Sequence, residues 1–264
     1  MGAMNNLIAL INKHCKLTKL NIGSGKVPWV DWTCLDELDS AGIKKCKFSK
    51  DCVLPAEDNS QNLVYSSHCL EHLDDPTVGR LLSESKRILA KKGKILIKIP
   101  DFDLFLNGYR QGKKGFMDNI IKFWPSWSWK NFNITDNDLN RMSYMFCGYW
   151  NKHYGDHFSG NIVYGPTSYN GPARMCEKSL KDLFSNQSIR EITKELKKEC
   201  LKDKNMKSFN HQNGWSKVDL VGLLDDHGFK VLASNQSSIR EKIGPTIPDF
   251  DFMGHWSMYV LAEA

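Results

Sequence analysis

The stretch Leu17-Thr-Lys-Leu-Asn-Ile-Gly-Ser-Gly25 decides how this chain is expected to fold. Its apolar positions predict a short strand over residues 17–22 that runs directly into a glycine turn. Gly23 and Gly25 can take positive φ and let the backbone approach a ligand closely, which suits a nucleotide-like cofactor. A strand ending in Gly-x-Gly also forms ordinary turns in α/β proteins, so the following strands must decide between the two interpretations.

Strands and helices alternate from this turn to residue 100. Eleven positions lead from Gly25 to Asp36, so the first crossover helix must be very short or irregular, and the second strand is expected to end at Asp36. Further strands are expected at 45–49, 62–66 and 94–99, and a helix at 76–92 with Gly93 as its C-terminal stop. This order predicts a doubly wound, mostly parallel sheet.

The alternation breaks after residue 100 and resumes at residue 216. The intervening segment holds most of the tryptophans and two or three expected helices, one of them at about 188–203. Ser216 can then cap a helix that ends at His227-Gly228, before strands at 229–233 and 257–262. We therefore expect a core of residues 5–100 and 216–264, with 101–215 inserted as a lid or acceptor-binding subdomain.

The composition is that of a folded protein. With 264 residues and 41% hydrophobic content the chain can bury a full core. Its net charge is +6, and the basic residues are interleaved with acidic ones instead of forming one run. Eight cysteines without a Cys-x-x-Cys pair predict reduced thiols and a cytoplasmic location. The apolar run at 7–11 is too short for a membrane span or a signal-peptide core, so no membrane partner is expected.

Two cofactors compete for a glycine turn followed by an acidic strand end. A dinucleotide site needs Gly-x-Gly-x-x-Gly opening a long helix and an acid about twenty residues later. Here Pro28 occupies the position of the third glycine, and Asp36 follows the glycine turn at too short a spacing. S-adenosylmethionine has no pyrophosphate to seat on a helix N-terminus, so it tolerates a degenerate first helix and is the preferred cofactor.

Taken together, the motifs resemble class I S-adenosylmethionine-dependent methyltransferases of the type 11 group. The resemblance covers 17–101 well and 209–233 moderately. It rests on Leu20-Asn-Ile-Gly-Ser-Gly25, Trp32-x-x-Leu-Asp36, Asp51-x-x-Leu-Pro-x-Glu-Asp-Asn-Ser60, Val64-Tyr-Ser-Ser-His-Cys-Leu-Glu-His-Leu73, and Arg87-Ile-Leu-x-x-x-Gly93 leading to Ile99-Pro-Asp101. It implies a Rossmann-like sheet whose last strand is antiparallel, and S-adenosylhomocysteine as product.

The resemblance also implies which residues hold the cofactor. In such enzymes the glycine turn contacts the methionine part, the acid of the second strand holds the ribose, and the loop after the third strand frames the adenine. These roles fall on Gly23, Ser24 and Gly25, on Asp36, and on Asp51 with Cys52, while Ser67 and His68 face the sulfonium and the substrate. Asn21 stands where an acid is frequent, and Val27 replaces a third glycine.

An alcohol acceptor also needs a base, and imidazole is the expected group. The candidates are His211, His68 and His157, with His153 beside them, although each could be a structural histidine. His211 gains support because Asn210-His-Gln-Asn-Gly-Trp215 resembles a stretch that precedes the fifth helix in type 11 relatives. His153 and His157 could share a metal, but no third ligand is identifiable, so we expect none.

Aromatic segments at 146–150 and 164–169 suit a pocket for a small polar acceptor. We therefore expect O-methylation of a sugar or sugar-like hydroxyl, for example in a surface polysaccharide precursor. Three alternatives stay open: N-methylation of a small molecule, RNA methylation through the lysines at 113–114 and 178–207, and a non-catalytic cofactor-binding regulator. No RNA-binding module is recognisable, so no nucleic-acid partner is expected, and the oligomeric state is not indicated.

Overall fold

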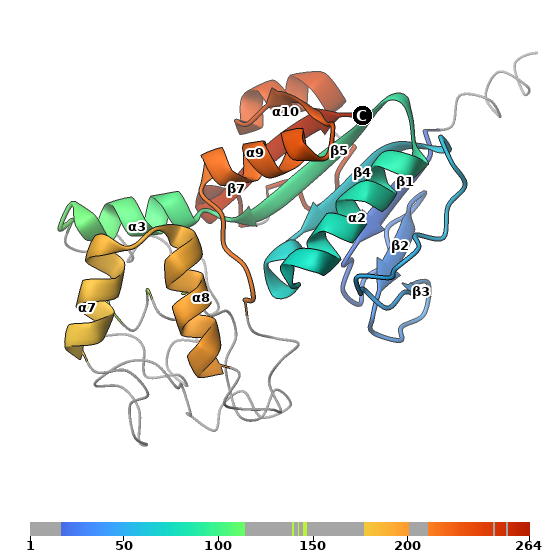
Figure 1. Ribbon diagram of the computed structural model, residues 1–264. Coiled ribbons are helices and arrows are strands. Elements are labelled where there is room, and N and C mark those ends of the chain that lie inside the picture. The colour runs from blue at the N-terminus through green and yellow to red at the C-terminus, as the bar shows by residue number, and fades with distance from the viewer. Residues whose placement is uncertain are drawn as a thin grey trace, which may run out of the picture.

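The structure is a computed structural model that describes residues 17–113, 139, 142, 145–146, 177–200, 211–244, 246–251 and 253–264. Seven strands form one sheet in the order β3-β2-β1-β4-β5-β7-β6 (Figure 1). Neighbouring strands are parallel from β3 to β5, and β7 is antiparallel to both β5 and β6. This confirms the expected Rossmann-like class I sheet with an antiparallel last strand.

The strands are β1 Lys19–Ile22, β2 Thr33–Asp36, β3 Lys44–Lys45, β4 Gln61–Ser67, β5 Leu89–Pro100, β6 Lys230–Ala233 and β7 Ser257–Glu263. The helices are η1 Leu70–His72, α2 Asp75–Ile88, α3 Phe102–Arg110, α7 Glu177–Asn186, α8 Ile189–Cys200, α9 Lys217–Asp226, α10 Gln236–Ile243 and η3 Gly254–Trp256.

Helices cover both faces of the sheet, and the alternation along β5 follows from this. Ile95 and Ile97 pack on the face covered by α2 and α9, while Leu96 packs on the opposite face with Ile239 of α10. Because successive residues of a strand point to opposite faces, a strand buried on both faces is apolar at nearly every position. The lysines at the start of β5 are exposed or half-buried, whereas Lys98 is a fully buried lysine within the apolar part of the strand.

The boundary between α2 and β5 differs from the prediction. The helix ends at Ile88, the strand begins at Leu89, and Gly93 lies inside the strand instead of ending the helix. A Cβ at Gly93 would lie 2.8 Å from the Ala90 carbonyl oxygen and 3.0 Å from that of Gln61. A glycine is therefore required at this position by close packing against neighbouring backbone. In the sequence, such a glycine looks the same as one that ends a helix.

The predictions for the first crossover and for the two ends of α9 are confirmed. Residues 23–32 form no helix, as the short crossover required. Ser216 caps α9 in a capping box with Asp219, and Gly228 follows the helix with φ of 75°. The third strand is shorter than expected and comprises only β3, so the prediction of a strand at 45–49 was wrong in its extent.

The segment after β5 leaves the sheet. Helices α3, α7 and α8 lie beyond the carboxyl end of β5 (Figure 1). The Arg110 side chain fastens α3 to α7 by donating to the Phe184 carbonyl at 2.9 Å. Trp215, by contrast, is 3% exposed and belongs to the core between the sheet and α9. No helix within the described ranges is long and apolar enough to cross a membrane.

Candidate active site

The glycine turn lies where the carboxyl ends of β2, β1 and β4 meet. Gly23 and Gly25 have φ of 71° and 67°, and the N–H groups of Gly23 and Ser24 both donate to the Leu35 carbonyl, at 2.9 and 3.0 Å. A Cβ at Gly23 would lie only 2.4 Å from the Cys69 sulfur. The turn therefore passes too close to the chain after β4 for any side chain at position 23.

Asp36 is held in place by backbone. Its Oδ2 accepts from the Gly25 N–H at 2.8 Å, and its Oδ1 accepts from the Leu38 N–H at 2.9 Å. A carboxylate oxygen can accept more than one hydrogen bond, so both oxygens keep capacity for ligand hydroxyls. The arrangement ties the glycine turn directly to the end of β2.

The other predicted cofactor residues differ in exposure. Asn21 is 2% exposed, and its side-chain oxygen has no hydrogen-bond partner among the described residues. Asp51 is exposed, whereas Cys52 is buried with its sulfur 3.8 Å from that of Cys46. The Cys52 side chain therefore points into the interior, and this residue could contact a ligand through its backbone. Ser67 ends β4 and is half-buried.

His68 follows β4 and stands between two polar partners. Its Nδ1 lies 3.3 Å from Oε1 of Glu71, and its Nε2 lies 2.9 Å from the Ser257 hydroxyl. The residue has φ of 47°, and its N–H donates to the Lys98 carbonyl at 2.8 Å. Glu71 is fully buried, so this carboxylate, imidazole and hydroxyl form a chain that leads outward from the interior.

Ser257 gives this chain a choice of proton arrangement. Its hydroxyl also lies 2.8 Å from the Met253 carbonyl oxygen. A serine hydroxyl has one proton, so it can donate either to Met253 or to Nε2 of His68, but not to both. When it donates to Met253, its oxygen can accept a hydrogen bond from an N–H at Nε2 of His68; when it donates to Nε2, its oxygen can accept from a group in front of it.

Glu71 is surrounded by three histidines. Burial raises its pKa, but the hydrogen bond and charge of His68, with further contributions from His72 and His211, outweigh burial and lower the pKa below the ordinary value. The rings of His72 and His211 pack edge to face with centroids 4.8 Å apart. Burial lowers the pKa of His211 to about 3, so this imidazole is neutral at neutral pH.

The predicted catalytic histidines thus have different surroundings. His68 directly follows the carboxyl end of β4 and is half-buried. His211 is 7% exposed and packs against His72 and Phe102, in the interior behind that edge. His157 and His153 lie outside the described residues.

Glu71 and Ser257 were not singled out from the sequence. Glu71 could have been noticed as one acid between two histidines in Ser67-His-Cys-Leu-Glu-His72. Ser257 carries no comparable signal, because it is 189 positions from His68 and only the antiparallel return of β7 brings them together.

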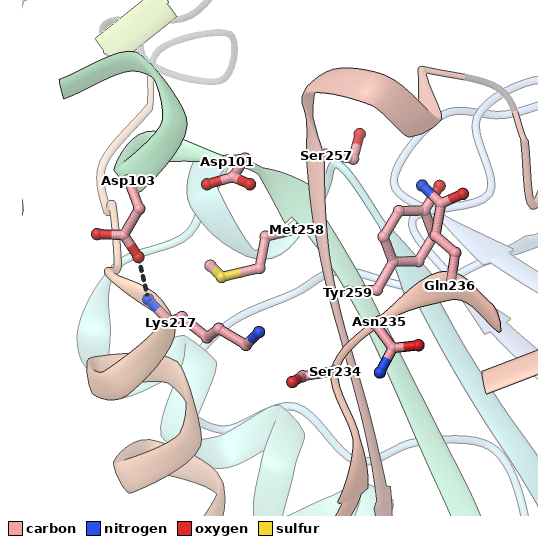
Figure 2. Close-up of a pocket in the computed structure, with 9 residues that line it drawn as sticks. All are labelled: Asp101, Asp103, Lys217, Ser234, Asn235, Gln236, Ser257, Met258 and Tyr259. Carbon is pink, nitrogen blue, oxygen red and sulfur yellow. Dashed lines mark hydrogen bonds between the residues drawn. The ribbon is translucent and has the colours of Figure 1, made fainter. Parts of the chain in front are cut away.

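A polar cavity of about 270 Å³ opens at the same edge of the sheet. It lies where β5 and β6 end and β7 begins, and Figure 2 shows the Lys217 side chain extending across it toward Ser234. Asp101 and Asp103 line it beside α3, and Ser257 lines it too. Burial raises the pKa of Asp101, which also caps α3 by accepting from the Leu104 N–H at 2.9 Å. The cavity therefore adjoins Ser257, the outer end of the series of polar contacts from Glu71 through His68.

A family model matches the first half of the sheet region. Residues 33–97 match the family model Methyltransf_11, described as "Methyltransferase domain". That match includes β2 and β4, and the strand order is the one expected for the class I sheet. The chain is a class I S-adenosylmethionine-dependent methyltransferase, and S-adenosylmethionine is its cofactor. No curated protein matches the chain.

Solved structures of methyltransferases are similar to the chain over most of its length. One from Aquifex aeolicus, described as a SAM dependent methyltransferase, is 11% identical with a TM-score of 0.37, covering 94% of this chain and 82% of that one. Another from Archaeoglobus fulgidus is 12% identical with a TM-score of 0.38, covering 98% and 92%. At these scores the likeness carries no weight, and the assignment rests on the family match and the strand order.

Proposed function

We propose that the cofactor lies across the carboxyl ends of β2, β1 and β4. The close approach at Gly23 and the fixed carboxylate of Asp36 support this placement, since a backbone cradle and a ribose acceptor stand side by side. Asn21 adds a buried amide oxygen without a partner among the described residues. The residues that we assign to cofactor binding are Asn21, Gly23, Ser24, Gly25, Asp36, Asp51, the Cys52 backbone, Ser67 and His68.

We further propose that the acceptor is a hydroxyl of a small, polar, sugar-like molecule. The observation that carries this proposal is the chain from Glu71 through His68 to Ser257, which ends at the polar cavity. When bound, S-adenosylmethionine supplies an electrophilic methyl group on a sulfonium. An alcohol, unlike a neutral amine, must lose a proton as it takes that methyl group, so a placed imidazole is most useful for oxygen.

His68 is the residue to which we assign that proton. Glu71 would hold the ring by its Nδ1 side, leaving Nε2 toward the cavity. The Ser257 hydroxyl, which lines the cavity, would pass its own proton to Nε2 as its oxygen receives the proton that the acceptor hydroxyl gives up. His211, proposed from the sequence as the base, would instead support Glu71 from the interior, because its ring is buried against His72.

The cavity suits such an acceptor. Its volume is near the lower end of ordinary ligand sites, about 300 Å³, and its lining offers carboxylate, amide, hydroxyl and ammonium groups. These groups can exchange several hydrogen bonds with a polyol. We propose that residues 101–215 complete the acceptor site as an inserted lid.

A cytoplasmic location is also proposed. Cys34, Cys46, Cys52 and Cys69 are free thiols, and the sulfurs of Cys46 and Cys52 remain unbonded at 3.8 Å. Thiols that persist this close together fit a reducing compartment.

The test is methyl transfer to a defined panel. The purified chain is incubated with S-adenosylmethionine and nucleotide sugars, free sugars, small amines or a structured RNA, and S-adenosylhomocysteine release is measured. Turnover with hydroxylated compounds alone supports the proposal. Turnover with amines or RNA would replace it by the corresponding alternative, and tight cofactor binding with no turnover on any compound would favour the regulator.

A further inference from the structure

The fold brings two distant segments together around Glu71. The stretch 211–215 returns to η1, where the N–H groups of Gln212 and Asn213 both donate to the Glu71 carbonyl, at 2.6 and 3.0 Å. The side chain of Gln212 donates to the His72 carbonyl at 2.9 Å, and that of Asn213 donates to the Leu73 carbonyl at 2.6 Å. These bonds fix His211 next to a segment 140 positions earlier.

The side chains gathered there are metal ligands by type. One ligand atom from each of Glu71, His72 and His211 can be chosen so that all lie within 4.8 Å of one another. Glu71 is 0% exposed and His211 is 7% exposed. Within the described part of the chain, Oε2 of Glu71 and Nδ1 of His211 have no hydrogen-bond partner.

Buried polar atoms in this state call for an explanation. A buried carboxylate without full compensation is costly, and His68 meets only the Oε1 side of Glu71, at 3.3 Å. A cation held among the three side chains would satisfy Oε2 of Glu71 and would use an imidazole nitrogen of His211. It would account for the burial and the convergence together.

We propose that Glu71, His72 and His211 bind one divalent transition-metal ion, with zinc the ion that they suit best. Two imidazoles and a carboxylate are an established ligand set for zinc with one position left open. Zinc bonds of about 2.0–2.2 Å require ligand atoms roughly 3.4 Å apart, so ligand atoms that now lie up to 4.8 Å apart must approach one another by up to about 1.4 Å on loading. His68, on the other oxygen of Glu71, would act as an outer partner that orients the carboxylate.

The proposed ion has a clear place in the fold. It would join η1 to the segment before α9 and so fix the chain that follows β4, where Cys69 packs against Gly23. The proposal does not depend on the nature of the methyl acceptor, because metal content is measurable without turnover.

The experiment measures metal on the full-length chain. The protein is stripped with a chelator, reloaded with Zn²⁺, dialysed, and analysed by mass spectrometry, and Co²⁺ is substituted to observe its visible absorption. We expect about one zinc per chain and Co²⁺ bands typical of low coordination number. His211→Gln should weaken Zn²⁺ binding at least about 100-fold, since even outer partners of metal sites contribute 10–100-fold.

His227→Gln is the matched control. His227 is a half-buried histidine at the end of α9, with its Nδ1 2.8 Å from the Leu223 carbonyl oxygen and outside the cluster. This variant should bind zinc like the natural chain. Zn²⁺ should raise the melting temperature of the natural chain and of His227→Gln, because an ion that binds only the folded state stabilises it. It should not raise the melting temperature of His211→Gln. Should His211→Gln fail to fold, His72→Gln replaces it.

Two results would overturn the proposal. One is a folded natural chain that takes up no Zn²⁺ or Co²⁺ at micromolar concentration. The other is equal binding by the natural chain and by folded His211→Gln or His72→Gln, which would place the ion elsewhere, for example at His153 and His157.

Discussion

The Asp36 carboxylate accepts a hydrogen bond from the Gly25 backbone N–H at 2.8 Å, so the end of β2 and the glycine turn after β1 form one rigid unit. This contact joins two features that the sequence offers separately, a positive-φ glycine and an acid at a strand end. In the cofactor placement that we propose, this unit sets a ribose acceptor beside the cradle for the methionine part.

The first prediction concerns this carboxylate. Asp36→Ala should weaken S-adenosylmethionine binding by roughly 1.5–3 kcal/mol, or about 10- to 150-fold, the usual contribution of a hydrogen bond to a charged group. Titration calorimetry provides the measurement. Asp39→Ala is the control, because Asp39 is exposed and forms a surface ion pair with Lys45, at 3.8 Å. Equal affinity in folded Asp36→Ala and Asp39→Ala would show that the ribose lies elsewhere.

The glycine turn gives a second prediction. Gly23→Ala should lower the free energy of unfolding by about 2–4 kcal/mol, combining left-handed strain of roughly 1–2 kcal/mol with overpacking against Cys69. Gly25→Ala should lower it by only about 1–2 kcal/mol, since nothing lies within 4 Å of the added Cβ. Urea denaturation compares the two variants. Equal losses would mean that the approach to Cys69 is looser than the structure shows.

Much of the sheet was predictable from sequence because local signals agree there. The apolar run of β4, the acid ending β2 and the capping box at Ser216 each act over a few residues. Gly93 misled the prediction because a glycine that ends a helix and one required for close packing look alike. The structure distinguishes the two cases because Gln61 of β4 pairs with Leu89, so β5 has already begun four residues before Gly93.

The site was less predictable because its contacts are long-range. Glu71 meets His211 only after the chain returns from α8, and Ser257 meets His68 only through the placement of β7 beside β5. Residue types suggested histidine chemistry, but no spacing in the sequence indicates which histidines share a carboxylate. The return of 211–215 to η1 is fixed partly by backbone hydrogen bonds that any residue except proline could donate. The side-chain amides of Gln212 and Asn213 add bonds to the carbonyls of His72 and Leu73, but nothing in the sequence indicates these distant partners.

A third prediction separates the two described histidine candidates. His68→Gln should reduce kcat by about 10²- to 10⁴-fold, the range for loss of a general base, while the protein stays folded. Steady-state release of S-adenosylhomocysteine measures the effect. His211→Ala is examined in parallel. If His211→Ala loses turnover while it keeps its fold, its cofactor affinity and its metal content, and His68→Gln stays active, the base is His211, as the sequence first suggested.

The fourth prediction concerns stability and pH. Burial lowers the pKa of Lys98 from 10.5 to about 8, against the charges of Asp249 and Asp251, which raise it. Between these two values the unfolded chain binds a proton that the folded chain does not, so stability rises with pH across this window. The rise from this residue amounts to about 3 kcal/mol.

Lys98→Met removes that contribution. The difference in free energy of unfolding between the natural chain and Lys98→Met should therefore grow in favour of the natural chain as pH increases from about 8 to about 10.5. Taking the difference cancels the titration of the buried thiols. Urea denaturation at several pH values measures it, and a difference that stays constant would show that the pKa of Lys98 is the same in the folded and the unfolded chain.

The proposed O-methylation is tested most directly by observing the transferred methyl group. S-adenosylmethionine labelled with carbon-13 in its methyl group is incubated with the enzyme and the acceptor panel, and the product is examined by carbon-13 NMR. We predict a new methyl resonance in the O-methyl region that depends on a hydroxylated acceptor and is lost in His68→Gln. A resonance in the N-methyl or C-methyl region would contradict the assignment of a sugar-like hydroxyl as acceptor.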